Sequence, residues 1–261
     1  MLLHRGPAPG GDPALELAIA HALVRRASDG EIGEVLRVHR PSVPVAAFGR
    51  REVRLDGFPG AADAVRRAGF VPAIRATGGR AVAFTDRAIV LDHVSPDPDA
   101  AGRLDHRFET FGRMLAGAFR DLGVDARMGA VPGEYCPGPH SVNARGVVKL
   151  VGTAQRVVRH AWLFSSLVIV GDTVRIRPLL TDVYGRLDQD FDGASVGSLS
   201  GESASLDLDT VEEALLTAYA GRGPLDPEPL DEPTLDRARE LLPQHRVGPD
   251  VAGVSGSGSR P

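Results

Sequence analysis

The sequence predicts an α+β fold in which a mixed, largely antiparallel sheet is flanked by helices. Short runs rich in β-branched residues follow one another with few full helices between them, which disfavours a doubly wound parallel sheet. The two longest helical patterns, 13–29 and 103–122, each carry an apolar stripe that can pack on one face of a sheet. The run 88–94 is apolar at nearly every position, which is typical of a central strand.

The composition limits the classes of function. A chain of 261 residues with 43% apolar content is long enough for one large domain or two small ones. The net charge of −4 provides no basic field, so we expect no nucleic-acid partner. No apolar run reaches the roughly 18 residues of a membrane span, and the N-terminus lacks a signal-peptide pattern. We therefore expect a cytoplasmic protein without a membrane partner.

Metal and ordinary nucleotide motifs are absent from the sequence. The eight histidines are scattered, and the single cysteine excludes both a Cys-x-x-Cys pair and an internal disulfide. No Gly-x-x-x-x-Gly-Lys-Ser/Thr loop occurs, so a P-loop is not expected. We expect no metal site.

The first elements follow from local signals. Residues 5–12 are rich in Gly and Pro and are predicted to form a loop, after which Asp12 is the expected N-cap of the first helix. Strands are predicted at 34–39 and 43–48. Because Pro44 has no backbone N–H, the second strand is expected to lie at an edge or to begin there.

The later elements are predicted from periodicity and turn residues. In order, they are a helix at 60–68, strands at 70–75, 80–84 and 88–94, the helix 103–122, strands at 124–128, around residue 149, at 157–170 (broken near 160) and at 173–177, and a short helix opened by Pro178. Residues 188–207 are predicted to be a polar loop, followed by helices at 208–220 and 232–243. The Gly/Ser-rich tail 249–261 is predicted to be disordered.

The only lysine of the chain, Lys149, stands out because every other residue in the Lys+Arg count of 30 is arginine. A compact ammonium held near a reacting centre cannot be replaced by a planar guanidinium. In a regular strand Lys149 would share a face with Val147 and Val151, so its head either snorkels to water or points into a pocket. Gly152 indicates a β-bulge or a close approach of backbone to a ligand.

The only cysteine, Cys136, lies in Tyr-Cys-Pro-Gly, a tight-turn pattern. One interpretation is an inert, small buried hydrophobe. The other is a reactive thiolate, which requires a pKa lowered by nearby positive charge. Lys149, His140 and Arg145 are close enough in sequence to supply that charge.

Two motifs resemble those of lipoate-protein ligases and octanoyl or lipoyl transferases. Residues 146–156, Gly-Val-Val-Lys-Leu-Val-Gly-Thr-Ala-Gln-Arg, are similar to the family motif Gly-Arg-Lys-x-x-Gly-Ser-Ala-Gln-Arg. Residues 74–82, Ile-Arg-Ala-Thr-Gly-Gly-Arg-Ala-Val, match Arg-Arg-x-x-Gly-Gly-x-Ala-Val. The motifs occur in the family's order, and the resemblance covers roughly residues 12–200.

The resemblance implies a catalytic domain of the biotin/lipoate ligase type. It would be one domain over 1–248, with a core at about 12–200 and C-terminal helices within 208–243. By resemblance, Lys149 contacts the acyl oxygen, and Cys136 carries the acyl group as a thioester, as in the cysteine-dependent octanoyltransferase branch. The implied substrate-binding residues are Arg75, Thr77, Gly78, Gly79, Arg80, Ala81, Gly152, Thr153 and Ala154.

The chain departs from the family pattern in several places. Ile74 stands where the family has the first arginine of a pair, and Phe84 stands where a histidine is common. The Lys149 motif has one extra residue and lacks the preceding arginine. These changes put phosphate binding in more doubt than acyl binding. The sequence Gly49-Arg50-Arg51 either borders the ligand pocket, as in the family, or is a turn with solvated arginines.

Three functions are consistent with these residues. The leading hypothesis is transfer of an octanoyl or lipoyl group through a Cys136 thioester, with Lys149 stabilising the acyl oxygen and no tightly bound cofactor. The acceptors would be lipoyl-domain proteins, either 2-oxoacid dehydrogenase E2 subunits or the glycine cleavage H protein, and acyl carrier protein is a candidate donor. The alternative is an ATP-dependent lipoate-protein ligase that uses ATP, Mg²⁺ and Lys149 without Cys136. The third is a non-catalytic module that binds an acyl ligand or a protein.

Overall fold

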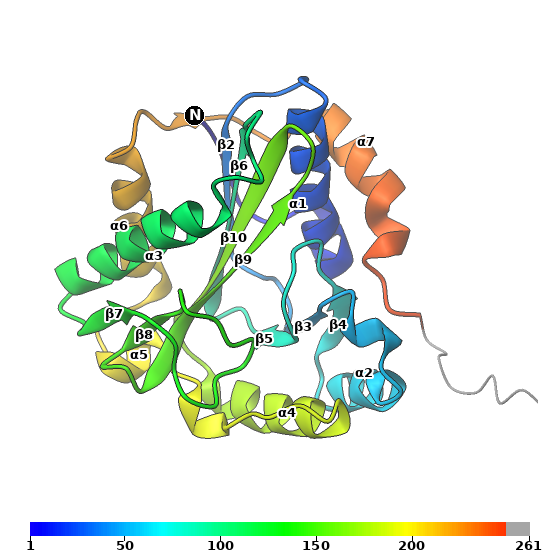
Figure 1. Cartoon of the computed structure of the whole chain (residues 1–261), viewed down its shortest axis with the longest axis vertical. Coiled ribbons are helices and arrows are strands. Elements are labelled where there is room, and N and C mark those ends of the chain that lie inside the picture. The colour runs from blue at the N-terminus through cyan, green and yellow to red at the C-terminus, as the bar shows by residue number, and fades with distance from the viewer. Residues whose placement is uncertain (249–261) are drawn as a thin grey trace, which may run out of the picture.

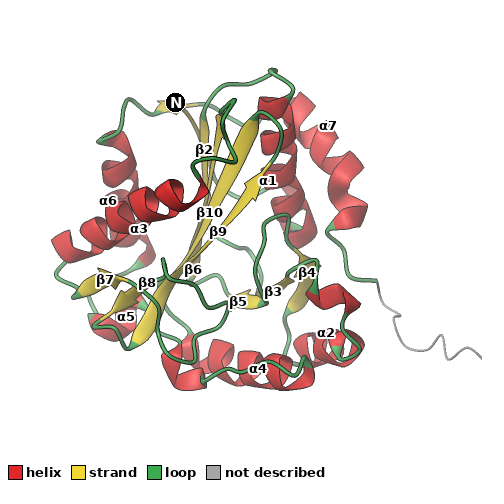
Figure 2. Cartoon of the chain, in the orientation of Figure 1, coloured by secondary structure: helices red, strands yellow, loops and turns green. Residues whose placement is uncertain are grey.

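An eight-stranded sheet runs through the molecule, as the computed structural model of residues 1–248 shows (Figures 1 and 2). Its strand order is β11-β1-β2-β6-β10-β9-β8-β7. In chain order the strands are β1 (Leu2–Arg5), β2 (Val35–His39), β6 (Ala88–Pro96), β7 (Ala126–Met128), β8 (Val142–Ala144), β9 (Val148–Val157), β10 (Ala161–Ile169) and β11 (Asp226–Pro227). Only β1 pairs in parallel, with β2 and β11. The predicted mixed, largely antiparallel sheet is confirmed.

A smaller sheet lies against one end of the large one. It has the order β4-β3-β5, formed by β4 (Val71–Ile74), β3 (Val45–Phe48) and β5 (Val82–Phe84). The helices α2 (Phe58–Arg67) and α4 (Thr173–Arg186) cover it at the bottom of Figure 1. Edge-to-face packing of Phe48 on Phe58, with ring centroids 5.0 Å apart, fixes α2 on β3.

Helices cover both faces of the large sheet (Figure 1). One face carries α1 (Pro13–Ser28) and α7 (Glu232–Leu241), and the other carries α3 (Leu104–Asp121) and α6 (Leu208–Ala220). The short α5 (Leu199–Glu202) follows a 3-10 turn in the segment predicted to be a polar loop. Within residues 1–248, no helix has both the length and the apolar composition of a bilayer-spanning segment.

The two main helices begin and pack as the sequence predicts. The Asp12 carboxylate accepts the Ala14 N–H at 2.9 Å and caps α1, with Pro13 in the first turn. In α3, Phe111 and Phe119 are buried in the core as predicted, whereas Phe108 is only partly buried. The predicted central position of β6 is confirmed, because it lies between β2 and β10.

Some boundaries differ from the prediction. Residues 173–177 are the first turns of α4 and not a strand, because Ile176 and Leu180 are spaced to pack on one helix face. Pro178 therefore lies inside the helix. The break predicted near residue 160 is confirmed, because β9 ends at Val157 and β10 begins at Ala161; the segment before the break belongs to β9.

The short strands β1, β8 and β11 were not predicted. Each has two to four residues, and their pairing depends on distant segments, such as Leu2 on Asp226. The predicted tail 249–261 lies outside the described residues.

Candidate active site

Cys136 lies on the loop between β7 and β8 in a left-handed backbone conformation, with a φ of 44°, which is uncommon for a residue other than glycine. Its N–H donates to the Tyr184 hydroxyl at 2.6 Å, and that hydroxyl donates to the Ala81 carbonyl at 3.0 Å. Tyr184 on α4 therefore joins the cysteine loop to the turn that precedes β5. The sequence assigned no role to Tyr184. The general rule that a buried tyrosine hydroxyl needs a hydrogen-bond partner could have indicated one.

The sulfur of Cys136 is half-buried and accepts two hydrogen bonds. The Arg80 N–H lies 3.2 Å from Sγ, and the Arg75 guanidinium lies 3.3 Å from it. Burial on its own raises the pKa of the thiol, but the charges of Arg75 and Lys149 and the Arg80 N–H outweigh it, so the pKa is lowered. These contacts provide the nearby positive charge that the thiolate interpretation of Cys136 requires.

The charges near the thiol differ in part from those expected. Lys149 contributes as predicted, whereas Arg75 was expected only to contact substrate. The Arg145 side chain instead pairs with Glu202 at 2.5 Å. His140 stacks on Phe108, with ring centroids 5.4 Å apart.

The two-glycine turn closes over the sulfur. Gly79 has a φ of +100°, and a Cβ at this position would lie 2.6 Å from Sγ and 2.3 Å from the Arg75 guanidinium. A Cβ on Gly49 would lie 2.0 Å from the Gly79 carbonyl oxygen. The prediction that this turn requires glycine is confirmed at Gly79, for both conformational and steric reasons.

Lys149 points inward from β9 and is 2% exposed, so the snorkelling interpretation is wrong. Its ammonium donates to the carbonyl oxygens of Tyr135 at 2.9 Å and Cys136 at 3.0 Å, and pairs with Glu134 at 2.9 Å. All three donors of the ammonium are thus engaged beneath the cysteine loop. Burial lowers the pKa of Lys149, while Glu134 and Cys136 act in the opposite direction.

A β-bulge orients this lysine. Between β8 and β9 the register shifts, so that Asn143 faces Lys149 and Val142 faces Val151. Leu150 and Val151 both pack in the core beneath α3, so Val151 does not share the Lys149 face, and that prediction was wrong. The bulge indicated by Gly152 is present two residues before it.

Two carboxylates hold the loops and were missed by sequence analysis. Glu134 accepts two N–H groups of its own loop, at 3.2 and 3.3 Å, in addition to pairing with Lys149. Glu52 accepts the N–H groups of Gly49 at 2.8 Å and Ala81 at 2.9 Å, and burial raises its pKa. The sequence did hold a signal for Glu134, because a buried lysine in the same stretch needs a counter-ion.

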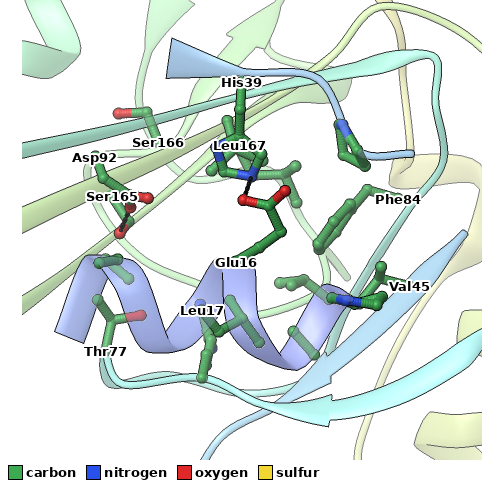
Figure 3. Close-up of a pocket in the computed structure, with 18 of the residues that line it drawn as sticks. Glu16, Leu17, His39, Val45, Thr77, Phe84, Asp92, Ser165, Ser166 and Leu167 are labelled. Carbon is green, nitrogen blue, oxygen red and sulfur yellow. Dashed lines mark hydrogen bonds and ion pairs between the residues drawn. The ribbon is translucent and has the colours of Figure 1, made fainter. Parts of the chain in front are cut away.

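A largely apolar pocket extends from the thiol between α1 and the sheets (Figure 3). Of the residues predicted to bind substrate, those that line it are Arg75, Thr77, Gly152, Thr153 and Ala154. Gly78 and Gly79 line a second hollow with Phe108 and His140. Cys136, Thr153 and Ala154 line both, which places the thiol where the two hollows meet. Arg80 and Ala81 act through backbone groups, as described above.

The departures from the family pattern also find positions in the structure. Phe84 forms part of the apolar pocket wall (Figure 3). Arg50 is exposed and contacts Gln244 at 3.2 Å, which supports the solvated-turn interpretation. Within residues 1–248, no cluster of three or more metal-ligating side chains occurs.

Comparisons with known proteins agree with this geometry. A curated relative, an octanoyl-GcvH:protein N-octanoyltransferase from Exiguobacterium sp., is 32% identical over 135 residues, which are 51% of this chain and 46% of the relative. The chain thus spans about half the length of the curated relatives it matches. These relatives share local sequence with the chain, not their whole length.

Solved structures show the same fold. A lipoate-protein ligase A bound with ATP superposes with a TM-score of 0.72 at 22% identity, covering 93% of this chain and 94% of that one. A bi-partite lipoate protein ligase from Thermoplasma acidophilum, studied with its E2 lipoyl domain, gives 0.70 at 22% identity, covering 93% and 91%. Residues 12–220 match the family described as the lipoyl protein ligase A/B catalytic domain, and the chain belongs to that family.

Proposed function

We propose that this protein transfers an octanoyl or lipoyl group to a lysine of a lipoyl domain through a thioester on Cys136. The observation that carries the proposal is the Cys136 sulfur, which accepts hydrogen bonds from Arg75 and Arg80 at the mouth of an apolar pocket. An environment that lowers the thiol pKa increases the thiolate fraction, which is the nucleophilic form. The named activity of the Exiguobacterium relative supports the same reaction class.

The reaction consists of two balanced acyl transfers. The Cys136 thiolate attacks the carbonyl carbon of an acyl thioester on a carrier, a new C–S bond forms, and the carrier thiolate leaves and takes up a proton. The neutral amine of the acceptor lysine then attacks the Cys136 thioester and a C–N bond forms. The C–S bond breaks to release the Cys136 thiolate, and the nitrogen gives up one proton to solvent. Division into two steps lowers each barrier relative to direct transfer.

The surrounding groups have separate roles in this proposal. The donors at Sγ, Arg75 and the Arg80 N–H, hold the thiolate before attack and after release. Lys149 stabilises negative charge at the reacting centre by its position beneath the cysteine loop. Because all three of its donors are engaged, direct donation to the acyl oxygen requires Lys149 to exchange one partner.

The two hollows suit the two parts of the substrate. The apolar pocket beneath α1 accommodates the acyl chain, while the hollow beside His140 accommodates the carrier arm or the acceptor lysine. Residues 1–248 act as one catalytic domain in this proposal, in the cytoplasm. The acceptor is a lipoyl-domain protein, such as the glycine cleavage H protein or an E2 subunit.

The experiment that tests the proposal uses purified protein, an octanoylated carrier protein and a lipoyl domain, with intact mass as the readout. The expected result is transfer without ATP that is lost in Cys136→Ser. An ATP-dependent ligase would instead attach free lipoate in the presence of ATP and Mg²⁺, and would remain active in Cys136→Ser. Full octanoyl transfer by that variant would exclude the thioester.

A further inference from the structure

The closed end of the apolar pocket is polar, although an octanoyl chain ends in a methyl group. Glu16 from α1, His39 from β2 and Asp92 from β6 line this end, and Ser165 from β10 lies between Asp92 and Ala154, nearer to the thiol (Figure 3). Each of the first three is at least nine-tenths buried. Burial of polar groups at a wall that only contacts a hydrocarbon costs free energy without a compensating hydrogen bond. The mechanism proposed above uses none of these side chains.

The sheet register places this cluster opposite the thiol. On the sheet face beneath α1, Gly152, Leu167, Val90 and His39 are successive cross-strand neighbours on β9, β10, β6 and β2. Three strand spacings of about 4.8 Å separate the first of these residues from the last, or about 14 Å. The Gly152 end lies beside Lys149 and the cysteine loop, so a chain bound at Cys136 extends along this row toward His39.

One ring nitrogen of His39 is buried without a hydrogen-bond partner among the described residues. Glu16 is engaged with the Arg37 guanidinium and accepts the Ala8 N–H at 2.6 Å. The Nε2 of His39 lies 3.7 Å from the Glu16 carboxylate, as the dashed line in Figure 3 shows. The Nδ1 of His39 is buried and has no hydrogen-bond partner within residues 1–248.

The chemistry of the ring identifies the type of group that fits. Burial, together with the charge of Arg37, lowers the pKa of His39 well below its ordinary value and favours the neutral ring. The Glu16 carboxylate favours the tautomer with its proton on Nε2, which makes Nδ1 an acceptor. In the adjacent row of cross-strand pairs, the Asp92 carboxyl accepts a hydrogen bond from the Ser165 hydroxyl. Asp92 is thus a second hydrogen-bond acceptor in this part of the pocket.

We propose that the pocket selects a medium-chain acyl group that carries a hydrogen-bond donor, such as a hydroxyl, near its distal end. This inference rests on the proposed function for the identity of the pocket as the acyl site. His39 accepts the distal donor through Nδ1, and Glu16 of α1, which pairs with Arg37 of the same strand as His39, orients the ring. A plain saturated chain leaves these buried groups without that partner.

The test is direct binding of free acids by calorimetry, which requires neither Cys136 chemistry nor an acceptor. The wild-type protein is expected to bind 8-hydroxyoctanoate about three- to tenfold more tightly than octanoate, the range that one net hydrogen bond supports. In His39→Phe the preference is expected to disappear or reverse. His39→Gln retains a hydrogen-bonding side chain and is expected to keep part of the preference.

The matched control is His93→Phe, which replaces an equally buried histidine on the opposite face of the sheet. It is expected to leave the preference unchanged. Equal or tighter binding of octanoate by the wild-type protein overturns the inference, even if the His39 variants do not fold. Loss of transfer activity with the 8-hydroxyoctanoate preference intact would contradict only the proposed function.

Discussion

The two ends of the acyl pocket each contain a buried cation paired with a carboxylate, but the pairs differ in what they face. At the thiol end, Lys149 pairs with Glu134, and its charge acts on the Cys136 sulfur. At the closed end, Arg37 pairs with Glu16 and faces the neutral ring of His39. The comparison shows that two similar buried ion pairs can have different roles. In our proposals the Lys149 pair lowers the pKa of the Cys136 thiol, whereas the Arg37 pair orients the ring of His39.

The pKa shifts of the acidic groups also differ between the two ends of the pocket. Burial raises the pKa of Asp92, while the Ser165 hydrogen bond and the charge of Arg37 act in the opposite direction. The thiol pKa is instead lowered, because Arg75 and Lys149 together outweigh burial. In the proposed function, the charges of Arg75 and Lys149 near the sulfur suit a thiolate and a developing oxyanion.

Removal of Lys149 is expected to have the largest effect. Lys149→Met leaves Glu134 buried without a counter-ion, which should reduce the free energy of unfolding by about 3–5 kcal/mol. Loss of the charge near the reacting centre should lower transfer activity on the order of 10²–10³-fold. Urea denaturation and single-turnover kinetics measure the two effects.

The double variant Lys149→Met with Glu134→Leu separates them. It should recover much of the stability without the activity, because an apolar pair replaces the ion pair. Arg37→Met is the matched change at the closed end and should lower stability without shifting the thiol pKa. If Arg37→Met shifts the thiol titration as much as Lys149→Met does, the contrast between the two ends is wrong.

The two glycines of the turn provide the next test. Gly79→Ala places a methyl group against Sγ at a positive φ, so we expect activity to fall on the order of 10²-fold. Stability should fall by about 1–3 kcal/mol from backbone strain. Gly78→Ala is the control, because nothing lies within 4 Å of the added Cβ. Equal losses in both variants would show that the turn is merely intolerant of substitution.

Arg75→Gln tests the origin of the lowered thiol pKa. A positive charge stabilises the thiolate and lowers the pKa, so removal of the guanidinium should move the midpoint to higher pH. The measurement is the rate of alkylation by iodoacetamide as a function of pH, since Cys136 is the only thiol. The wild-type midpoint should lie below the pKa of an ordinary cysteine thiol, about 8.5. An unchanged midpoint in Arg75→Gln would assign the shift to other groups.

Tyr184→Phe should have the smallest effect of these changes. It leaves the Cys136 N–H and the Ala81 carbonyl without their partner, which costs about 1–3 kcal/mol. Tyr219→Phe is the control, because the buried Tyr219 hydroxyl has no partner within residues 1–248. Thermal unfolding of the two variants should therefore differ, and equal melting temperatures would remove Tyr184 from the account of the cysteine loop.

The parts of the fold that were predicted correctly are those with a strong local pattern. The apolar run of β6 and the aromatic stripe of α3 determine their own structure and burial. The helix start at residue 173 was missed because Thr173-Val174-Arg175-Ile176 is rich in β-branched residues and resembles a strand. Its packing against α2 overrides that local preference.

The candidate site was predictable only where residues lie in motifs. The two motifs located Lys149 and the glycine turn, and the Tyr-Cys-Pro-Gly pattern located Cys136. Glu134 and Tyr184 were missed, since their roles depend on which loops meet in three dimensions. The polar end of the pocket had no local signal at all, because Glu16, His39 and Asp92 come from three separate elements.

The central claim is that Cys136 carries the acyl group during transfer. The most direct measurement is a rapid-quench time course in which the octanoylated protein is mixed with a lipoyl domain, and peptide mass spectrometry locates the octanoyl group. We expect the group on Cys136 first, and its loss should match the gain on the acceptor lysine. An acceptor that gains the octanoyl group while none is ever found on Cys136 would contradict the account.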